Sequence, residues 1–547
     1  MRLSPVVLAV LSACAVSANA AVYQVQELPE ITTVRSQFGN ALNDNGDIVG
    51  SANYVYNQPF DLDALDLEST VVTAAFTTEE IENIKIGNIN AALNSKLLSF
   101  FMNPTSYEVQ RVGDVQAFDF DTGEQVKIRD QGEVPTSREY LYDINNLGNA
   151  IGMATPVYQK QDFTPAATDD DPSPETVTLW VPQNPYQQAY LLNGGSRQAL
   201  PIPYAENGGG FSVAQKISGN NYIAGSGSVG MSDTVVEQIE TNCTGDSAPI
   251  AICQANYAGS YTERALVWQL NSSGQIGAPV EYGFLGPEIN EEGISLTYLS
   301  RALSVNNNGV AVGYSSYTDK SRDIYNQVHA TVFHEGEVSP VVDPLEWISS
   351  SAVDINNENI VVGTAYKNIN GTTRSKMFVF DYNTNTVKYP TGFFVSSGTM
   401  PTAVNDHGMV VGAGEVFLSD SATRRQVAFL YDIAADTFTD LNTLLPCNST
   451  YNVVDARDIN ENNEIVATVV KSVEGRDSLG EVVRDSAGNP VMESVARTVL
   501  LKPVANGTVD DCSSGSDDGE TYERKSGSSS WLMVLLVPLA WMRRRYF

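Results

Sequence analysis

One short motif occurs seven times along this chain and constrains its fold more than any other feature. Its clearest copy reads Val-Asn-Asp-His-Gly-Met-Val-Val-Gly over residues 404–412. We call the place of Asn405 in this copy the polar position; an aliphatic residue precedes it in every copy. Three places after it comes Gly or Asn, the two residues that adopt positive φ most readily. Each copy predicts a β-hairpin with a polar four-residue turn. A closing Gly follows in six copies, where a side chain would block a neighbouring backbone, and Ala467 takes this place in the last copy. The polar positions are Asn43, Asn145, Ser218, Asn306, Asn356, Asn405 and Asn460.

A second apolar segment follows each hairpin and is often followed by a turn and another short strand. Each unit therefore supplies four strands, and one such sheet cannot bury both of its faces alone. Stacking seven units in a closed ring solves this problem, so the sequence predicts an all-β, seven-bladed β-propeller of antiparallel blades. An open β-solenoid or two β-sandwiches are the alternatives. The second segments cover residues 116–120, 177–180, 264–268, 329–333, 376–380, 427–431 and 497–501.

The last unit lacks a fourth strand of its own, because polar linker composition begins soon after Leu501. A β-rich segment at residues 22–28 precedes the first hairpin. We expect this N-terminal strand to pair with residues 495–501 and to close the ring.

The hairpins and the strands after them resemble the HAF-type extracellular repeat. The resemblance rests on the Ile-Asn-x-x-Gly-x-Val-Val-Gly pattern and on the pair His329-Ala330, and it covers about residues 22–501. It implies a secreted bacterial β-repeat protein and no established activity.

The two ends of the chain predict export. Arg2, an apolar core at residues 5–11 and the run Ala18-Asn19-Ala20 form a signal peptide cleaved after Ala20. Residues 11–14 also have lipobox form, which leaves a lipidated Cys14 as the alternative. We therefore assign residues 1–20 to the signal peptide, 21–504 to the propeller, 505–530 to a Ser/Gly/Asp-rich linker and 531–547 to a C-terminal segment.

The C-terminal segment combines small residues, an apolar run and a cluster of arginines. Residues 531–542 are apolar but too few for a comfortable membrane span, and Arg543-Arg544-Arg545 should stay in the cytoplasm. The segment resembles the GlyGly-CTERM sorting signal, although Ser526-Gly527-Ser528 replaces the usual Gly-Gly pair. The resemblance implies a sorting protease that cuts near these residues, with transient membrane association followed by release to the cell surface or medium. A plain C-terminal membrane anchor is the alternative.

Four cysteines remain after the expected cleavage, and an even number in an exported chain suggests disulfides. Cys243 and Cys253 lie in one polar loop and are natural partners. That leaves Cys447 to pair with Cys512.

Long insertions between the second and third strands of a blade should all lie on one face. That face is the expected binding face, as in many repeat proteins. In the first insertion, Thr77 and Glu80 have capping-box spacing, and a stripe from Ile81 to Leu97 predicts a helix that packs onto the propeller or caps its channel. The insertions cover residues 51–114, 155–175, 227–262, 315–327 and 471–494.

Residues with catalytic or metal-binding potential are few. The chain has three histidines and no Gly-x-Ser-x-Gly elbow, so no catalytic residue is nominated. Asp143, Asp354 and Asp458 occupy equivalent places two residues before the repeat's Asn; they could face the channel and bind a cation or sugar, or they could cap turns and bond neighbouring blades. The run Asp169-Asp170-Asp171 is a weak candidate for Ca²⁺, and no other metal or cofactor is indicated.

Two classes of function fit this sequence. The net charge of -33 argues against nucleic acid and anionic membranes as partners. The favoured class is an exported binding module that recognises an extracellular protein or glycan through the insertion-bearing face. The other is an extracellular hydrolase or lyase that uses the channel carboxylates.

Overall fold

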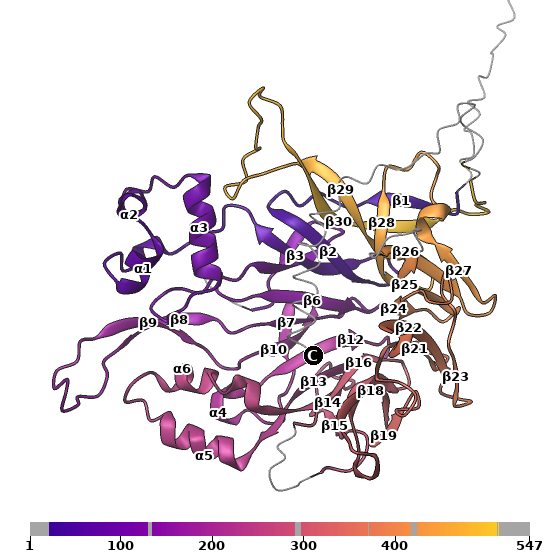
Figure 1. Ribbon diagram of the computed structural model, residues 1–547, viewed down its shortest axis with the longest axis horizontal. Coiled ribbons are helices and arrows are strands. Elements are labelled where there is room, and N and C mark those ends of the chain that lie inside the picture. The colour runs from indigo at the N-terminus through magenta and orange to yellow at the C-terminus, as the bar shows by residue number, and fades with distance from the viewer. Residues whose placement is uncertain are drawn as a thin grey trace, which may run out of the picture.

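The seven repeats form seven four-stranded antiparallel sheets in a ring, as expected for a seven-bladed β-propeller (Figure 1). The computed structural model describes residues 21–129, 134–289, 297–369, 371–416, 424–510 and 512. The expected cleavage site at Ala20 and the processing region Ser526, Gly527 and Ser528 lie outside these residues. In the described part of the chain, no helix is long and apolar enough to cross a membrane.

The blades follow one another in chain order, and the first strand of each lies nearest the ring axis. Blade 1 contains β2 (Val34–Leu42), β3 (Ile48–Val55), β4 (Val115–Asp119) and β5 (Glu124–Val126). Blade 2 contains β6 (Glu139–Ile144), β7 (Ala150–Ala154), β10 (Gln188–Asn193) and β11 (Ser196–Ala199). Blade 3 contains β12 (Ser212–Ile217), β13 (Tyr222–Met231), β14 (Tyr261–Gln269) and β15 (Val280–Tyr282). Blade 4 contains β16 (Ser300–Val305), β17 (Ala311–Asp319), β18 (Ile324–His334) and β19 (Glu337–Pro340).

The remaining three blades have the same order. Blade 5 contains β20 (Ser349–Ile355), β21 (Ile360–Ile369), β22 (Thr372–Asp381) and β23 (Thr386–Lys388). Blade 6 contains β24 (Thr399–Val404), β25 (Met409–Val416), β26 (Arg425–Asp432) and β27 (Thr437–Asp440). Blade 7 contains β28 (Asn452–Ile459), β29 (Ile465–Glu474), β30 (Met492–Pro503) and, from the other end of the chain, β1 (Tyr23–Glu27).

The predicted closure of the ring by the N-terminal strand is confirmed. β1 pairs antiparallel with β30, from Tyr23 opposite Pro503 to Glu27 opposite Val499. The Tyr23 side chain is buried against blade 7 and its hydroxyl donates to the backbone oxygen of Asn463. The last blade therefore takes strands from both ends of the domain.

Every inner strand contains an irregularity at the same position, two to four residues before the repeat's polar position. In blade 4, for example, the register of β16 and β17 shifts between Ala302 and Ser304. The closing Gly of the motif lies opposite this bulge, and a Cβ on Gly313 would be 1.9 Å from the backbone oxygen of Arg301. The prediction that this Gly permits a close backbone approach is confirmed. Equivalent clashes, at 1.9–2.4 Å, would arise at Gly50, Gly152, Gly225, Gly363 and Gly412.

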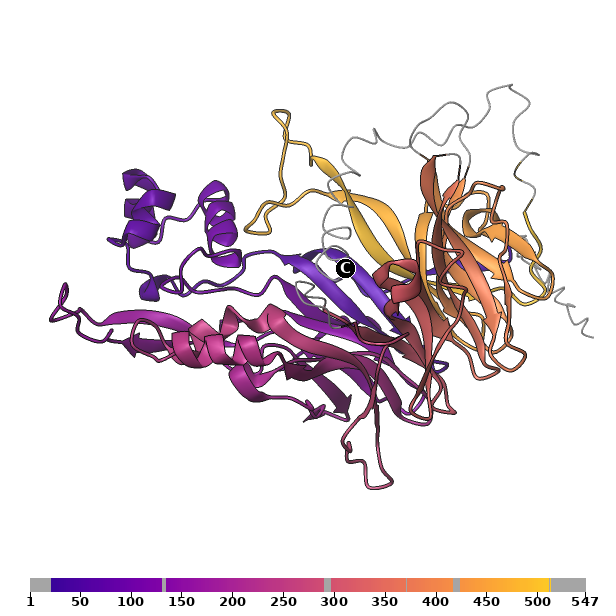
Figure 2. The ribbon, with the colours of Figure 1, turned by 60° about the horizontal axis from the view of Figure 1, so that its bottom comes forward.

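One strand assignment from the sequence is wrong. Residues 177–180 were expected to form the third strand of blade 2, but β9 (Val177–Pro182) pairs with β8 (Tyr158–Phe163) in a separate hairpin that projects from the ring (Figure 2). The third strand is β10, which pairs with β7. Val-Thr-Leu-Trp matches the apolar pattern of the repeat better than β10 does, and the pairing partner of a short apolar strand cannot be deduced from composition.

The first insertion folds into three helices instead of the single helix expected. These are α1 (Thr70–Ala75), α2 (Thr78–Lys85) and α3 (Ala91–Met102), with a 3₁₀ turn at Leu62–Ala64 before them. The capping box of Thr77 and Glu80 is confirmed at the start of α2, but Gly87, at φ +70°, ends the helical run after it. The helices bury a small apolar core of their own and lie at the edge of the ring, so they do not cap the channel (Figure 1).

The third insertion carries α5 (Asp233–Asn242) and α6 (Ile250–Ala255), and a one-turn helix, α4 (Glu206–Gly209), lies before β12. Short 3₁₀ turns occur at Ala258–Ser260, Lys320–Arg322 and Leu441–Leu444. Both predicted disulfides are confirmed: Cys243–Cys253 joins α5 to α6, and Cys447–Cys512 ties the segment after β30 to the loop before β28.

Loss of the second disulfide has a measurable expected effect. The Cys447–Cys512 bond closes a loop of 65 residues. Replacing both cysteines with Ser should therefore lower the free energy of unfolding by roughly 2–4 kcal/mol. Chemical denaturation of both proteins measures this difference. The Cys243–Cys253 bond closes a loop of only ten residues, so replacing these two cysteines with Ser should lower the free energy of unfolding by less. Equal effects of the two exchanges would contradict the argument from loop length.

Candidate functional site

A polar cavity of about 170 Å³ lies on the ring axis, at the face formed by the turns of the repeats. All seven blades contribute to its wall, which places it at the end of the central channel; we call it the channel mouth. Its lining comes from the last residues of each inner strand and the first residues of each turn. The charged lining residues are Asp44, Asp143, Lys216, Asp354, Asp406, Asp458 and Glu461.

The repeat's asparagine holds its own turn and the next blade at once. In blade 2, Asn145 Oδ1 accepts from the backbone N–H groups of Leu147 (3.0 Å) and Asn149 (3.1 Å). Its Nδ2 donates to the backbone oxygen of Ser218 in blade 3, at 3.0 Å. The same inter-blade bond runs in one direction around the ring and is made by Asn43, Asn145, Asn306, Asn356, Asn405 and Asn460.

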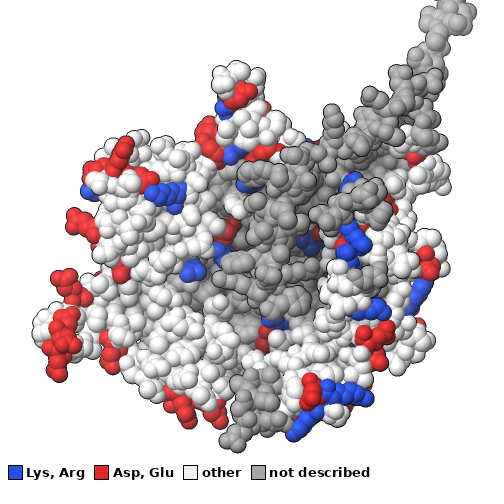
Figure 3. All heavy atoms as spheres, viewed as in Figure 1, with Lys and Arg blue, Asp and Glu red and all other residues white. Residues whose placement is uncertain are grey.

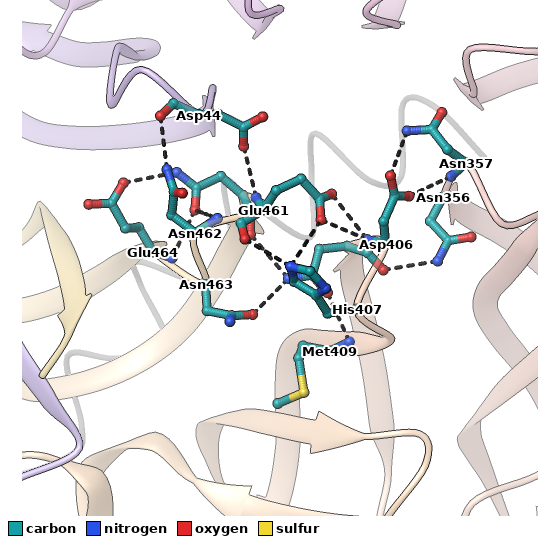
Figure 4. A network of polar contacts seen from close by, with 12 residues as sticks. Asp44, Asn356, Asn357, Asp406, His407, Met409, Glu461, Asn462, Asn463 and Glu464 are labelled. Carbon is teal, nitrogen blue, oxygen red and sulfur yellow. Dashed lines mark hydrogen bonds and ion pairs between the residues drawn. The ribbon is translucent and has the colours of Figure 1, made fainter. Parts of the chain in front are cut away.

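The residue after each asparagine builds a second ring at the rim of the mouth, part of which is drawn in Figure 4. The backbone N–H of Asp406 donates to the Glu461 carboxylate, at 3.0 and 3.1 Å. Glu461 N–H donates to Asp44 Oδ1, and Asp44 N–H donates to Asn146 Oδ1, both at 2.8 Å. Equivalent bonds join Asn307 to Asn357 and Asn357 to Asp406. Acidic and amide side chains of the rim are thereby fixed in place.

Asparagine at the repeat position is expected to stabilise the ring blade by blade. Changing Asn145 to Ser removes the Nδ2 donor to blade 3 and should lower the free energy of unfolding by about 1–3 kcal/mol. Changing Ser218 to Asn adds the donor that blade 3 lacks and should raise it by about 0.5–1.5 kcal/mol. Thermal and urea unfolding of the two variants tests the pair. Changes of the same sign in both would contradict this role.

The three aspartates singled out from the sequence do line the channel mouth, below the asparagine ring. Asp143 and Asp458 face one cation, Lys216, whose Nζ is 3.5 Å from a carboxylate oxygen of each. The second oxygen of each aspartate accepts a backbone N–H from the following blade: Ile217 donates to Asp143 (2.7 Å) and Leu42 to Asp458 (3.1 Å). Both carboxylates therefore link adjacent blades.

Asp354 is bound in the same way. Its Oδ2 accepts from the backbone N–H of Val404 in blade 6, at 2.8 Å. Its Oδ1 accepts from the Ser304 hydroxyl in blade 4, at 2.6 Å. The interpretation of these aspartates as bonds between neighbouring blades fits the geometry better than the interpretation as free ligands for a cation.

The protonation of this cluster reflects burial in competition with charge pairing. Burial raises the pKa of Asp143 to about 7, although Lys216 pulls it down, and burial likewise raises the pKa of Asp458. Burial alone would lower the pKa of Lys216, but the carboxylates of Asp143, Asp458 and Asp354 outweigh it and raise this pKa. Lys216 thus stays charged, while Asp143 can hold a proton near neutral pH.

Sequence reasoning missed Lys216, the central residue of the cluster. The signal was present, because alignment of the repeats puts Lys216 at the same position as Asp143, Asp354 and Asp458. A lysine aligned with three aspartates does not by itself reveal that it faces two of them across a closed ring.

The three histidines lie in three different surroundings. His329 is buried between blades 4 and 5, where Nδ1 lies 3.3 Å from Ser350 Oγ. Burial lowers its pKa to about 4, and Ser350 Oγ already accepts from the backbone N–H of Ala330. His407 lies exposed on the rim beside Glu461 (Figure 4). His334 contacts the Tyr382 hydroxyl on the outer part of the blades.

The acidic run Asp169-Asp170-Asp171 lies in the exposed loop between β8 and β9. Its Asp171 carboxylate accepts from the backbone N–H of Ser173, at 3.4 Å. Over the residues that the structure describes, no group of three or more His, Cys, Asp or Glu side chains could hold a metal ion. Calcium binding by this run stays a prediction.

A second candidate region is built by the insertions of blades 7, 1, 2 and 3. We define the insertion platform as residues 475–491, 56–114, 155–187 and 232–260. These segments project together from one side of the ring, whereas the corresponding connections of blades 4 to 6 are short (Figure 2).

Specific polar contacts join each insertion of the platform to the next. The backbone oxygen of Ser478, from blade 7, accepts from Asn57 N–H (2.8 Å) and Asn94 Nδ2 (3.0 Å) of blade 1. Lys160 of blade 2 forms a salt bridge of 2.8 Å with Asp61 of blade 1. The insertions of blades 2 and 3 are joined by a bond of 2.8 Å from Ala166 N–H to Asp246 O. Four insertions thus form one connected surface.

The closed ring, its N-terminal closure strand and its polar channel mouth define the class: a seven-bladed β-propeller. A family model described as a protein of unknown function, DUF3466, matches residues 1–545. The chain belongs to this family. No curated protein matches the chain.

Several solved structures match the chain at low similarity. A polysaccharide lyase of family PL25, an ulvan lyase, has 9% identity and a TM-score of 0.33 over 88% of this chain and 97% of its own. A protein of unknown function from Dyadobacter fermentans has 13% identity and a TM-score of 0.31 over 66% and 92%. A prolyl endopeptidase has 11% identity and a TM-score of 0.33, and the match spans 62% of this chain but only 41% of the peptidase. Similarity at this level assigns no activity to the chain.

Proposed function

We propose that this DUF3466 protein is an exported binding module that recognises an extracellular protein through its insertion platform. The observation that carries the proposal is the interlocking of four insertions from consecutive blades. Loops that served only as connections would not need contacts with one another, whereas a rigid surface costs less conformational entropy when it binds.

Exposed apolar side chains on the platform favour a protein over a glycan as the partner. Aliphatic groups that face solvent are suited to the apolar core of a protein interface, while a glycan is bound mainly by aromatic faces and polar groups. Figure 3 shows few charged side chains over much of this region, with acidic ones gathered at its outer end. Exposed large side chains of the platform are Ile86, Val177, Tyr186, Ile250, Val483 and Val491.

The proposal includes the route of export. The signal peptide ending at Ala20, the HAF-type character of the repeats and the sorting tail cut near Ser526, Gly527 and Ser528 together imply passage through the periplasm to the cell surface or medium. The two confirmed disulfides support this route, because such bonds persist in oxidising compartments.

The alternative of a hydrolase or lyase has less support. An acid–base pair needs carboxyl oxygens that can reach a substrate, but both oxygens of Asp354 and one oxygen each of Asp143 and Asp458 are bonded to neighbouring blades. The remaining oxygens of Asp143 and Asp458 face Lys216.

A charged patch placed on the platform should abolish partner binding. The test compares the exported protein with a variant carrying Ile86→Asp, Ile250→Asp and Val483→Asp, which change side chains that are 73%, 48% and 41% exposed. The matched control changes Leu147, Leu345 and Val387 to Asp; these side chains are 64%, 48% and 38% exposed and lie off the platform.

Binding to intact cells, with the captured protein identified by cross-linking and then remade in pure form, is the readout. We expect the platform variant to lose binding to the pure partner at least tenfold and the control to keep it, with equal melting temperatures. If the protein bound only to a glycan array and to no protein, its partner would be a glycan instead of a protein. Equal binding by both variants would refute the platform as the site.

A further inference from the structure

Blade 3 departs from the other six at the channel mouth in three neighbouring positions. It has Lys216 where other blades have Asp, Ser or Ala, and Ser218 where all others have Asn. It has Gly219 where the rim of every other blade carries Asp, Asn or Glu. The three departures lie in four consecutive residues, and all three residues line the cavity.

Gly219 leaves the rim ring open between blades 2 and 3. At the preceding junction, Asp44 N–H donates to the Asn146 side chain. Asn146 N–H should donate in turn to the side chain at 219, but glycine has none, and this N–H has no partner among the residues that the structure describes. On the other side of blade 3, Asn220 N–H donates to Asn307 Oδ1 at 2.9 Å, one residue later than at the other junctions.

Lys216 gives the channel mouth a further donor. Its ammonium group carries three N–H donors, and the described part of the chain offers it two acceptors, Asp143 and Asp458, both at 3.5 Å. Its side chain is 29% exposed, so it reaches the cavity and is not sealed beneath it. Asn146 and Lys216 both line the cavity.

The charge of the cavity restricts what can occupy it. Six carboxyl side chains and one ammonium group line the channel mouth, so an anionic ligand meets a net negative potential. Carboxylate oxygens of the wall that accept one N–H from a neighbouring blade, such as Asp44 Oδ1 and Asp406 Oδ1, keep a second lone pair that can accept from a hydroxyl group. A cavity of about 170 Å³ has the volume of roughly six water molecules at about 30 Å³ each, which is about the size of one sugar ring.

We propose that the open junction between blades 2 and 3 of the channel mouth binds a neutral, hydroxyl-rich ligand of the size of a single sugar ring. An oxygen of the ligand takes the place of the missing side chain at 219 and accepts from Asn146 N–H. Another accepts from Lys216, and the remaining hydroxyls donate to the carboxylate oxygens of the wall. This site involves no residue of the insertion platform and is independent of the function proposed above.

The test fills the gap with the side chain that the other blades carry. A Cβ at position 219 would be 3.0 Å from Asn307 Oδ1, the end of a side chain that can shift, and Gly219 does not have a positive φ. Gly219→Asn should therefore fold, with an unchanged or higher melting temperature. The control is Leu147→Ser, an exposed rim residue outside the cavity.

Saturation-transfer NMR on the full exported protein, with glucose, galactose and N-acetylglucosamine as separate probes, gives the readout. We expect transfer to at least one of these sugars, a loss of at least fivefold with Gly219→Asn, and no loss with Leu147→Ser. Galacturonate, a similar ring that carries a negative charge, should bind more weakly than galactose. Transfer to none of the neutral sugars, equal transfer with Gly219→Asn, or preference for galacturonate would each overturn the proposal. The platform variant described above should bind these sugars normally, which separates failure of this site from failure of the proposed function.

Discussion

Deleting residues 21–29 should destabilise all seven blades together, and not only the end of the chain. The deletion removes β1, exposes the edge of β30 and uncovers the core around Tyr23, whose side chain is 3% exposed. Loss of one ladder of five residue pairs and one buried tyrosine should cost more than about 4 kcal/mol. We expect the melting temperature of the whole domain to fall by several degrees and the transition to broaden.

A peptide with the sequence of residues 21–29 provides the control. Added in excess, it should pair with β30 and restore much of the lost stability, because the rest of blade 7 is intact. Calorimetry with and without the peptide measures both effects. A deletion variant that melts like the full protein would show that closure by β1 is dispensable.

Replacing Lys216 with Met should lower the free energy of unfolding by about 3–5 kcal/mol at neutral pH. The change removes the cation that faces both Asp143 and Asp458 and leaves these buried carboxyl groups without it. Changing Lys388 to Met removes an exposed salt bridge with Asp436 and should cost no more than about 1 kcal/mol. Urea unfolding of both variants measures the contrast.

The destabilisation by Lys216→Met should depend on pH. Burial already raises the pKa of Asp143 to about 7, and removing Lys216 takes away the charge that lowers it. A carboxyl group with a raised pKa binds more protons in the folded state, so its contribution to stability is present at low pH and is lost as pH rises through the folded pKa. The variant should therefore be closest to the original protein at about pH 5 and furthest from it at about pH 8.

Neutralising the two carboxyl groups provides the internal check. Adding Asp143→Asn and Asp458→Asn to the Lys216→Met variant should recover part of the stability and flatten the pH dependence. If the loss of stability in the triple variant equalled the sum of the losses in the three single variants, unpaired charge would not be the cause of the destabilisation by Lys216→Met.

The repeat and the closure strand could be predicted because each depends on local sequence. Turn residues such as Asn405 and Gly408 fix a hairpin by their own conformational preferences, and a strand without a partner at each end of the domain leaves one way to close the ring. The cysteine pairs followed from loop position and count. Residues 177–182 were misassigned because their pairing partner in β8 is set by tertiary structure, which apolar composition does not specify.

The candidate site was only partly predictable for a related reason. The sequence left the channel as one of two possible positions for Asp143, Asp354 and Asp458, and it could not show which of their oxygens are bonded to neighbouring blades. Nor could it show the interlocked platform, because contacts such as that of Asn94 with Ser478 join residues 384 positions apart. These contacts depend on the ring being closed.

The disulfide between Cys447 and Cys512 also determines how the domain responds to a mechanical load. A pull on the chain beyond Cys512 reaches Cys447 through the sulfur–sulfur bond as well as β30 through the backbone. The loop between blades 6 and 7 therefore shares the force, and the β1–β30 ladder that closes the ring carries less of it. Reduction of this one bond would put the whole of the same pull onto β30 and peel open the last blade from its end.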